Sequence, residues 1–480
     1  MPEFITRRQL LRGCGGGMGS VALSALLADQ GLLSNSAIAE GNPFASKKQH
    51  FPVKAKSVIW LFMNGGPSQV DTWDYKPELE KHDGQELEGF DKNTGFFTGN
   101  VGPIMKSPFK FRQYGESGSW VSEIFPQMAR HVDKMAFIHS GYTESNNHSP
   151  ALFMINTGMK RMGFPSLGSW VTYGLGTENQ NLPAFVTMSD PLNRGLPKGY
   201  AQNWGAGFLP SIYQGTWFKP QGDPIDNLKI SGTKNLAQQR ALLDTLNDLN
   251  QDHQKTRPEQ RDLETRINSF ELAYRMQQAA PEALDIQRET SETLKAYGVG
   301  DKKCEHFAKQ CLTARRMVER GVRFIQIYSG GTENARSWDG HTSIAKNHGQ
   351  FAGETDQPIG ALLQDLDQRG LLDSTLVIWG GEFGRTVYCQ GQDLVNYGRD
   401  HHGRNFSIWM AGAGVKAGHV HGETDDFSYN IVKDPVHVHD LNATMLHMMG
   451  VDHERLTYRF QGRDFRLTDI HGEVLHDILA

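Results

Sequence analysis

The sequence predicts an α/β protein built on one doubly wound, mostly parallel β-sheet that carries a helical insertion. Short continuous apolar runs recur along the chain, helical segments separate several of them, and polar or glycine-rich turns follow them. Apolar runs between turn signals are typical of strands buried on both faces, and their alternation with helices is typical of parallel sheets. The 480 residues are compatible with one large domain with insertions.

Five short segments, most of them apolar runs, are expected to form strands of this sheet. They cover residues 57–63, 135–139, 322–328, 374–379 and 406–410. The run at 57–63 and the run at 374–379 are expected to be sheet neighbours, since both are continuously apolar.

Helices are expected between and after these strands. The first covers about 150–156, with Pro150 in its first turn, where a missing N–H costs nothing. Others are expected at about 303–320, 357–369 and 441–449. The segment at about 234–300 is expected to be a helical insertion, because its first part is rich in Gln, Leu, Asp, Arg and Glu.

The N-terminus predicts a twin-arginine export signal over residues 1–39. Arg7 and Arg8 precede a weakly apolar stretch at 13–33, and Ala-Ile-Ala at 37–39 forms a small-x-small cleavage site. The alternative is a buried N-terminal helix. A polar linker is expected at 40–56, and the mature protein is expected to be periplasmic or extracellular, without stable membrane insertion.

Charge and cysteine content exclude other classes of protein. The chain has 49 Lys and Arg against 54 Asp and Glu, so a basic face for nucleic acid is not expected. Cys14 lies in the predicted signal, which leaves Cys304, Cys311 and Cys389. An odd number does not form a disulfide framework, and these three residues are expected to be small packing residues.

Histidines and acidic residues gather next to the predicted strands. The carboxyl ends of parallel strands meet at one edge of a sheet, where ligands bind. Imidazole and carboxylate groups are ligands of Zn, Mn or Fe, although a single Asp-x-His is more often a surface pair. The residues concerned are Asp339, His341, Glu382, Arg385, His401 and His402.

The order of the motifs resembles the family known as domain of unknown function 1501, a sulfatase-like branch of the alkaline phosphatase superfamily. The motifs lie at 64–68, 71–74, 338–341, 382–386, 398–402, 412–415 and 422–425. The resemblance spans nearly the whole mature chain, so residues 57–480 are expected to form one domain. It implies an alkaline phosphatase-like sheet and an ester-hydrolase ancestry.

The chain departs from sulfatases at the position that resembles their nucleophile. A sulfatase makes formylglycine there from Cys or Ser, whereas this chain has His148, and Leu152 stands where the motif has Arg. The resemblance therefore implies a protein that lacks formylglycine. Ser149 is the nearest hydroxyl group.

The resemblance implies up to two ions, with Zn, Mn and Ca left open. One would be held by Asp339, His341 and His402, with His401 as a further candidate ligand. The second would be held by Asn64, His148 and Glu382, where an Asn carbonyl replaces the usual Asp.

The expected function is hydrolysis of an anionic phosphate or sulfate ester of unknown identity. A metal would act as a Lewis acid and lower the pKa of a bound water to about 7. Arg385 would clamp the anionic oxygens, and His148 would be a ligand, a general base or a nucleophile. The alternative is a non-catalytic binding or surface-assembly protein. His419, His421, His437 and His439 are interpreted as loop or structural residues.

Overall fold

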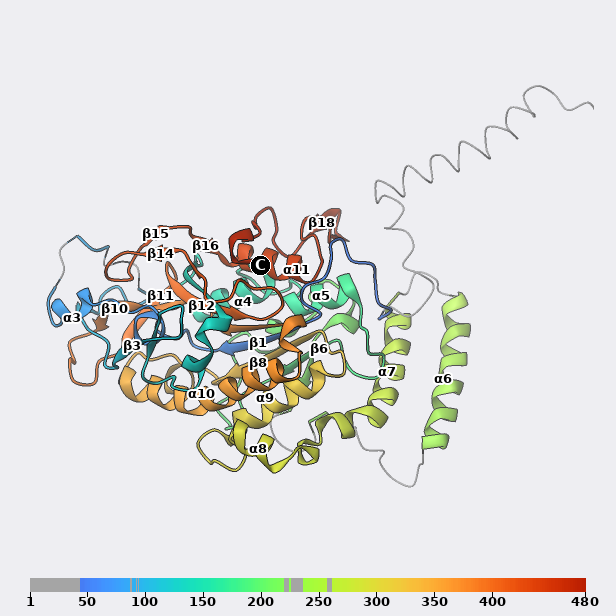
Figure 1. Ribbon diagram of the computed structural model, residues 1–480. Helices are drawn as coiled ribbons and strands as arrows, with labels where there is room; N and C mark the ends of the chain where they lie inside the picture. Colours follow the sequence, from blue (N-terminus) through green and yellow to red (C-terminus); the bar gives the residue numbers. More distant parts are fainter. Residues whose placement is uncertain are drawn as a thin grey trace, which may run out of the picture. The chain divides into compact units, whose positions relative to one another are not determined.

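The computed structural model in Figure 1 describes residues 44–480, except 87–88, 92, 94, 220–223, 226–235 and 257–260. Residues 46–480 form one compact unit. The predicted export signal at 1–39 lies outside the described residues. Within the described part of the chain, no helix is both long and apolar enough to cross a membrane.

A mostly parallel sheet forms the centre of the larger unit. Its strands follow the order β13-β5-β12-β9-β1-β8-β6-β7, and β16 also pairs with β5. β12 runs antiparallel to both of its neighbours, while the other pairs are parallel. The strands are β1 (Ser57–Met63), β5 (Met135–Tyr142), β6 (Phe185–Met188), β7 (Thr216–Phe218), β8 (Phe324–Ser329), β9 (Thr375–Gly380), β12 (Phe406–Ala411), β13 (Val420–His421) and β16 (Val436–His437).

The predicted fold class is confirmed by the position of β1 in this sheet. β1 pairs in parallel with β9, with Ile59 opposite Val377, and in parallel with β8 on its other side. Every residue of β1 is buried. An interior strand covered on both faces explains why its sequence is continuously apolar rather than alternating.

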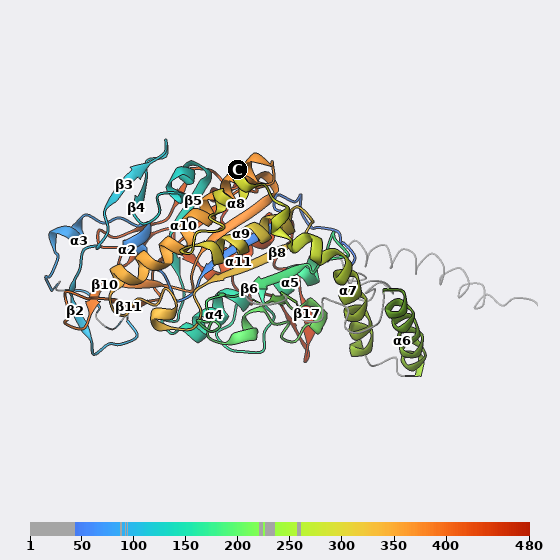
Figure 2. The same cartoon turned by 90° about the horizontal axis from the view of Figure 1, so that it is seen from below.

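Helices cover both faces of the sheet. On one face, Ile59 and Leu61 of β1 share a core with α9 (Glu305–Val318) and α10 (Ile344–Gln368). On the other face, Val58 and Trp60 share a core with α4 (His148–Thr157), α5 (Leu167–Leu175) and α11 (Val438–Met448). Figure 1 shows α9 and α10 below the sheet and α5 and α11 above it, and Figure 2 gives the view from below.

The segment predicted to be a helical insertion contains three helices. They are α6 (Leu236–Thr256), α7 (Arg261–Leu284) and α8 (Ser291–Tyr297). Arg240 of α6 forms paired hydrogen bonds of 2.9 and 2.6 Å with Glu271 of α7. The end of α7 joins the core, because Ala280 and Ala283 are fully buried there.

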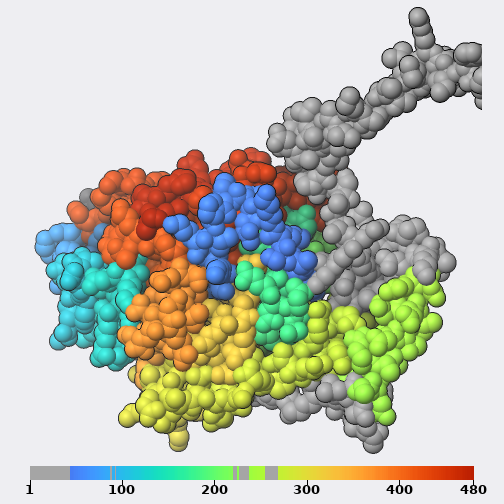
Figure 3. Space-filling view, turned by 45° about the vertical axis from the view of Figure 1, so that its right-hand side comes forward, coloured from blue at the N-terminus to red at the C-terminus, as the bar shows by residue number. Residues whose placement is uncertain are grey.

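Residues predicted to form a linker lie against the end of α11. The N–H groups of Lys54 and Ala55 both donate to the carbonyl of Met448, and His50 donates to Gly450. Figure 3 shows this early segment in blue beside the red C-terminal segments. The stretch at 50–56 is therefore part of the folded unit.

A second, small antiparallel sheet was not expected from the sequence. It has the order β11-β10-β2 and consists of β2 (Val101–Ile104), β10 (Gly384–Gln390) and β11 (Arg399–His402). Arg385 lies opposite His401 in its register. The remaining short elements are α2 (Gln69–Thr72), α3 (Glu78–Lys81), β3 (Phe111–Tyr114), β4 (Ser119–Ser122), β14 (Glu423–Thr424), β15 (Ile431–Lys433), β17 (Tyr458–Phe460) and β18 (Arg463–Phe465).

Candidate metal centre

Four side chains from three parts of the chain converge at one edge of the sheet. His148 begins α4 after β5, Asp339 and His341 follow β8, and His401 lies on β11. One potential ligand atom from each lies within 4.8 Å of all the others. The loops after β5 and β8 bring these residues together, as expected for the ligand-binding edge of an α/β sheet.

The Asp339 carboxylate lies at the centre of the group. Its Oδ1 is 2.9 Å from Nε2 of His341 and 3.1 Å from Nε2 of His401. Its Oδ2 is 3.2 Å from Nε2 of His148. All three imidazoles therefore direct the same ring nitrogen toward one carboxylate.

The opposite nitrogen of each imidazole contacts an acceptor. Nδ1 of His148 lies 2.7 Å from Oε1 of Glu382, and Nδ1 of His401 lies 2.7 Å from the Asn146 carbonyl. Nδ1 of His341 donates to Oε1 of Gln390. These acceptors favour a hydrogen on Nδ1, so a bound metal ion could take the place of any hydrogen on Nε2, which is the arrangement of metal-binding histidines.

One nitrogen of the group lacks a hydrogen bond of its own. Nε2 of His148 is buried and has no hydrogen-bond partner, although Oδ2 of Asp339 is 3.2 Å away. This distance is short enough for a hydrogen bond, so it is the relative orientation of the His148 ring and the Asp339 carboxylate that does not meet the geometry of one. An unsatisfied buried nitrogen beside a carboxylate and two more imidazoles fits a divalent ion such as Zn²⁺.

Burial and charge set the protonation of the group. Burial alone would lower the pKa of His148, but Asp339 and Glu382 raise it from 6.5 to about 9. Burial, with His148 and Arg385 nearby, holds the pKa of His401 well below its ordinary value. Burial opposes ionisation of Asp339, yet Arg385 and the three imidazoles lower its pKa strongly. Asp339 is therefore an ionised carboxylate.

Arg385 does not have the position expected for a substrate clamp. Its side chain is fully buried, and its donors go to the carbonyls of Gly65, Gly66 and Arg399 and to Oδ1 of Asp339. The N–H donors of the guanidinium are thus used in hydrogen bonds to other groups of the protein. It fixes Asp339 and the loop after β1 instead of facing a ligand.

His402 is not part of the group, which corrects the predicted ligand set. Its Nε2 donates to the Tyr429 carbonyl at 2.8 Å, and its ring stacks on Tyr429. Successive side chains of a strand point to opposite faces, so only one of the adjacent histidines of β11 can face Asp339. The structure places His401 there.

The second predicted ion site is not present as a separate group of ligands in the described residues. His148 belongs to the Asp339 group, and Glu382 supports His148 from behind and accepts the Gly65 N–H at 3.0 Å. Asn64 donates from Nδ2 to the Gly331 carbonyl, while its buried Oδ1 has no partner. Only one metal centre is therefore supported at this edge.

Ser149 stands beside the group without joining it. Its backbone N–H donates to Oδ1 of Asn147, which caps α4. In the part of the chain that the structure describes, its hydroxyl forms no hydrogen bond with the four clustered residues. Leu152, at the position of the sulfatase Arg, is buried in the core of the sheet.

The loop after β1 must approach the group closely. Gly65 has a φ of 107°, and a Cβ there would lie 2.6 Å from the backbone nitrogen of Asp339. Gly66 has a φ of 74°, and a Cβ added there would clash with the Phe383 ring. Glycine at both positions permits this left-handed backbone and the close packing that holds the Asp339 segment.

Two phenylalanines that sequence reasoning missed flank the group. The Phe97 ring is 5.3 Å from the His341 ring, and the Phe96 ring is 5.6 Å from the His401 ring. Both side chains are about two-fifths exposed, at 43% for Phe96 and 41% for Phe97. No apolar run marks them in the sequence, because they lie in a loop.

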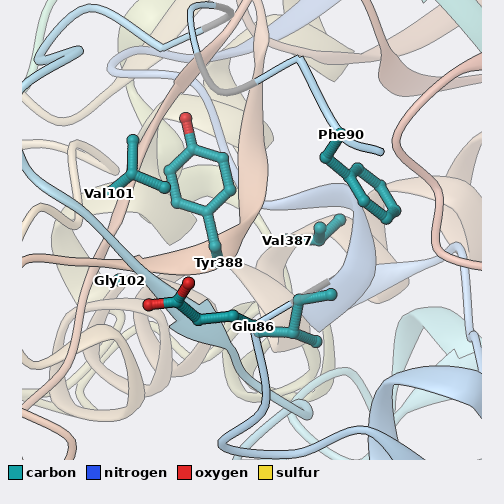
Figure 4. A pocket seen from close by; sticks show the side chains of 7 residues that line it. Glu86, Phe90, Val101, Gly102, Val387 and Tyr388 are labelled. Atoms are coloured by element: carbon teal, nitrogen blue, oxygen red, sulfur yellow. The ribbon is translucent and has the colours of Figure 1, made fainter. Parts of the chain in front are cut away.

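A recess of ≈ 20 Å³ opens at the small sheet, away from the four clustered residues. Figure 4 shows Phe90, Val101, Val387 and Tyr388 among the side chains that line it. None of the clustered residues lines this recess. It has room for about one water molecule and offers no substrate site.

Comparison with known proteins identifies the family. The family model described as "Protein of unknown function (DUF1501)" matches residues 55–479. The chain belongs to this family. No curated protein matches it.

Solved structures show distant likeness. The chain is similar to the phosphonate monoester hydrolase SpPMH from Silicibacter pomeroyi, with 12% identity, coverage of 74% of this chain and 71% of that chain, and a TM-score of 0.37. It is similar to the PsFucS1 sulfatase from Pseudoalteromonas sp., with 13% identity, coverage of 83% and 68%, and a TM-score of 0.32. A variant of TAB5 alkaline phosphatase gives 11% identity, coverage of 78% and 94%, and a TM-score of 0.31. The ligand assignment rests on the geometry described above.

Proposed function

We propose that this DUF1501 protein is an exported, metal-dependent hydrolase of phosphate or sulfate esters. The ion would be held by His148, Asp339, His341 and His401. One observation carries the proposal: three imidazoles direct Nε2 toward one ionised carboxylate while an acceptor holds each Nδ1. Three histidines and a carboxylate suit Zn²⁺ or Mn²⁺ better than Ca²⁺, which prefers oxygen ligands.

The residues around the proposed metal ion would each have a separate role in ester hydrolysis. A divalent ion there would supply Lewis acidity to a phosphoryl or sulfuryl oxygen. Glu382 holds the proton on Nδ1 of His148 and thereby orients the ring. Arg385 keeps Asp339 ionised and in place. Phe96 and Phe97 lie against the rings of His401 and His341 and reduce the access of water to them.

The proposal includes the absence of a formylglycine nucleophile. The aldehyde forms only from Cys or Ser, and His148 occupies the position that resembles the sulfatase nucleophile. Cys304, Cys311 and Cys389 are all buried away from the four ligands. Export by the twin-arginine route is proposed from Arg7, Arg8 and the Ala-Ile-Ala at 37–39.

A second candidate is a non-catalytic binding or surface-assembly protein. Two observations favour it: the guanidinium of Arg385 donates to protein carbonyls and Asp339, and the Ser149 hydroxyl forms no hydrogen bond with the described residues of the cluster. In that case the ion would stabilise the loops at the sheet edge. Metal binding and catalysis must therefore be measured separately.

Adjacent histidines on β11 provide a matched pair of variants. His401→Gln removes a proposed ligand, whereas His402→Gln removes a buried imidazole that faces the other side of the strand. Elemental analysis is expected to find one ion fewer in His401→Gln than in wild type, and no loss in His402→Gln. Equal metal content in all three proteins would contradict the metal centre.

The same three proteins separate the two candidate functions. Activity would be measured on p-nitrophenyl phosphate, bis-p-nitrophenyl phosphate and p-nitrophenyl sulfate. The hydrolase proposal expects turnover in wild type and His402→Gln and its loss in His401→Gln. Bound metal without turnover of any phosphate or sulfate ester tested would favour the binding protein.

A further inference from the structure

A second cluster of metal-binding side chains lies near the C-terminus. His419 and His421 flank one residue at the edge strand β13, and Asp477 comes from the last residues of the chain. One potential ligand atom from each lies within 4.8 Å of the other two. The cluster shares no residue with the centre around Asp339.

The three side chains lie close enough together to share one small ion, and His421 and Asp477 are at present in hydrogen-bond contact. Nδ1 of His421 is 2.6 Å from Oδ2 of Asp477, and Nε2 of His419 is 3.6 Å from the same oxygen. Ligands about 2.1 Å from a tetrahedral ion are separated by about 3.4 Å. Small side-chain movements would therefore bring all three into coordination.

The backbones that carry these side chains are held independently. The Phe137 N–H of β5 donates to the His419 carbonyl at 2.8 Å, and His421 pairs with Ile138. On the other side, Ala480 donates to Gly414 at 2.8 Å. Main-chain hydrogen bonds thus hold the backbone of each half, in addition to the side-chain contact between His421 and Asp477.

The side chains themselves leave one group unsatisfied. Nε2 of His419 is buried and has no hydrogen-bond partner, although the carboxylate lies nearby. His421 is almost fully buried, whereas about half of the Asp477 side chain is exposed and gives an ion access from solvent. A buried imidazole nitrogen without a partner is costly, and an ion would satisfy it.

We propose that His419, His421 and Asp477 bind one divalent transition-metal ion that ties the C-terminal residues to the edge of the central sheet. Two imidazoles and one carboxylate favour Zn²⁺, Ni²⁺ or Cu²⁺ over Mg²⁺ or Ca²⁺. With three protein ligands, at least one coordination position stays open to water. The proposed role is structural and independent of ester hydrolysis.

The test is zinc titration of the full chain against a chromogenic chelator. It uses His401→Gln, which weakens the other centre, as the background. Adding His419→Ala is expected to remove one bound zinc ion per chain. Adding His447→Ala, which removes a histidine outside both clusters, is expected to remove none. Equal zinc binding with and without His419→Ala would overturn the site, whether or not the Asp339 centre binds metal.

Hydrogen exchange tests the structural role. Zinc is expected to slow amide exchange at residues 476–480 in the His401→Gln protein and not in the protein that also carries His419→Ala. Circular dichroism would verify that both proteins are folded. Zinc that binds through His419 without slowing exchange at 476–480 would overturn the tie to the C-terminus.

Discussion

The guanidinium of Arg385 donates a 2.7 Å hydrogen bond to Oδ1 of Asp339, and both side chains are buried. The same guanidinium holds the carbonyls of Gly65 and Gly66, so one cation joins the loop after β1 to the segment after β8. This contact lowers the free-energy cost of burying the negative charge of Asp339. It also ties the stability of the sheet edge to its proposed metal ligand.

Replacement of Arg385 by Met should therefore destabilise the whole fold. The variant leaves a buried carboxylate and several carbonyls without their donor, and loss of one partner of a buried ion pair costs about 3–5 kcal/mol. Urea unfolding would measure the free energy of unfolding. The control is Arg404→Met, since Arg404 pairs with Asp91 at the exposed surface and should change stability by less than about 1 kcal/mol. Similar losses for both variants would contradict this account.

The stability of the metal-free protein should decrease as the pH rises from 6.5 to 9. The folded-state pKa of His148 is about 9 against an ordinary value of 6.5, so its imidazolium stabilises the fold fully below pH 6.5. That contribution disappears as the group loses its proton near pH 9. At about 1.4 kcal/mol per pKa unit, the loss is about 3 kcal/mol.

Unfolding in urea with a chelator, at several pH values, would measure this effect. His148→Gln should remove about 3 kcal/mol of pH dependence over this range. His402→Gln should keep it, because burial lowers the pKa of His402 to about 4 and its ring is already neutral. Parallel pH profiles for wild type and His148→Gln would show that His148 does not hold the extra proton.

Glu382→Gln should weaken metal binding without unfolding the protein. Glu382 accepts from Nδ1 of His148 and from the Gly65 N–H, and the amide retains its size but loses its charge. Loss of such a supporting partner typically lowers metal affinity by about 10- to 100-fold. Competition with a chelator of known affinity would give the dissociation constant.

Glu354→Gln is the matched control for that prediction. Glu354 is also a buried carboxylate, but it pairs with Arg194 at 2.6 Å, outside the centre. Its replacement should lower stability and leave the affinity of the centre unchanged. If the two variants lower metal affinity equally, the effect is not specific to the contact between Glu382 and His148.

An aldehyde-reactive probe should not label the peptide that contains residues 145–160. Formylglycine requires Cys or Ser at the position of His148, and the Ser149 hydroxyl forms no hydrogen bond with the described residues of the cluster. Mass spectrometry after proteolysis would detect the adduct. A labelled 145–160 peptide would contradict the proposed chemistry, and a formylglycine sulfatase labelled in parallel shows that the probe works.

The central sheet was predictable because its strands are covered on both faces. Burial on two sides favours apolar residues, and β1, β8, β9 and β12 are predominantly apolar, although β8 includes the buried Gln326. The helix expected at 357–369 is longer than predicted, since α10 starts at Ile344. Gly349, Gly353 and Pro358 lower the helix propensity of its first half and conceal the true start.

The candidate metal ligands were only partly predictable, because the small sheet that carries one of them is polar. β11 reads Arg-Asp-His-His and is fully buried, so no apolar pattern indicates a strand. Without the strand, nothing in the sequence distinguishes His401 from His402. Asp339, His341 and His148 were predicted as ligands and do converge, whereas Arg385 was assigned to the substrate although its partners lie within the protein.

The hydrogen bond from His401 to the Asn146 carbonyl joins residues 255 positions apart. β5, which precedes His148, likewise pairs with β12, β13 and β16 near the other end of the sequence. Almost the whole polypeptide must therefore be synthesised before the four clustered side chains can come together. Contacts of such long range form late in folding. The proposed metal ion would then bind after folding, and the compartment in which folding is completed would determine which ion the centre receives.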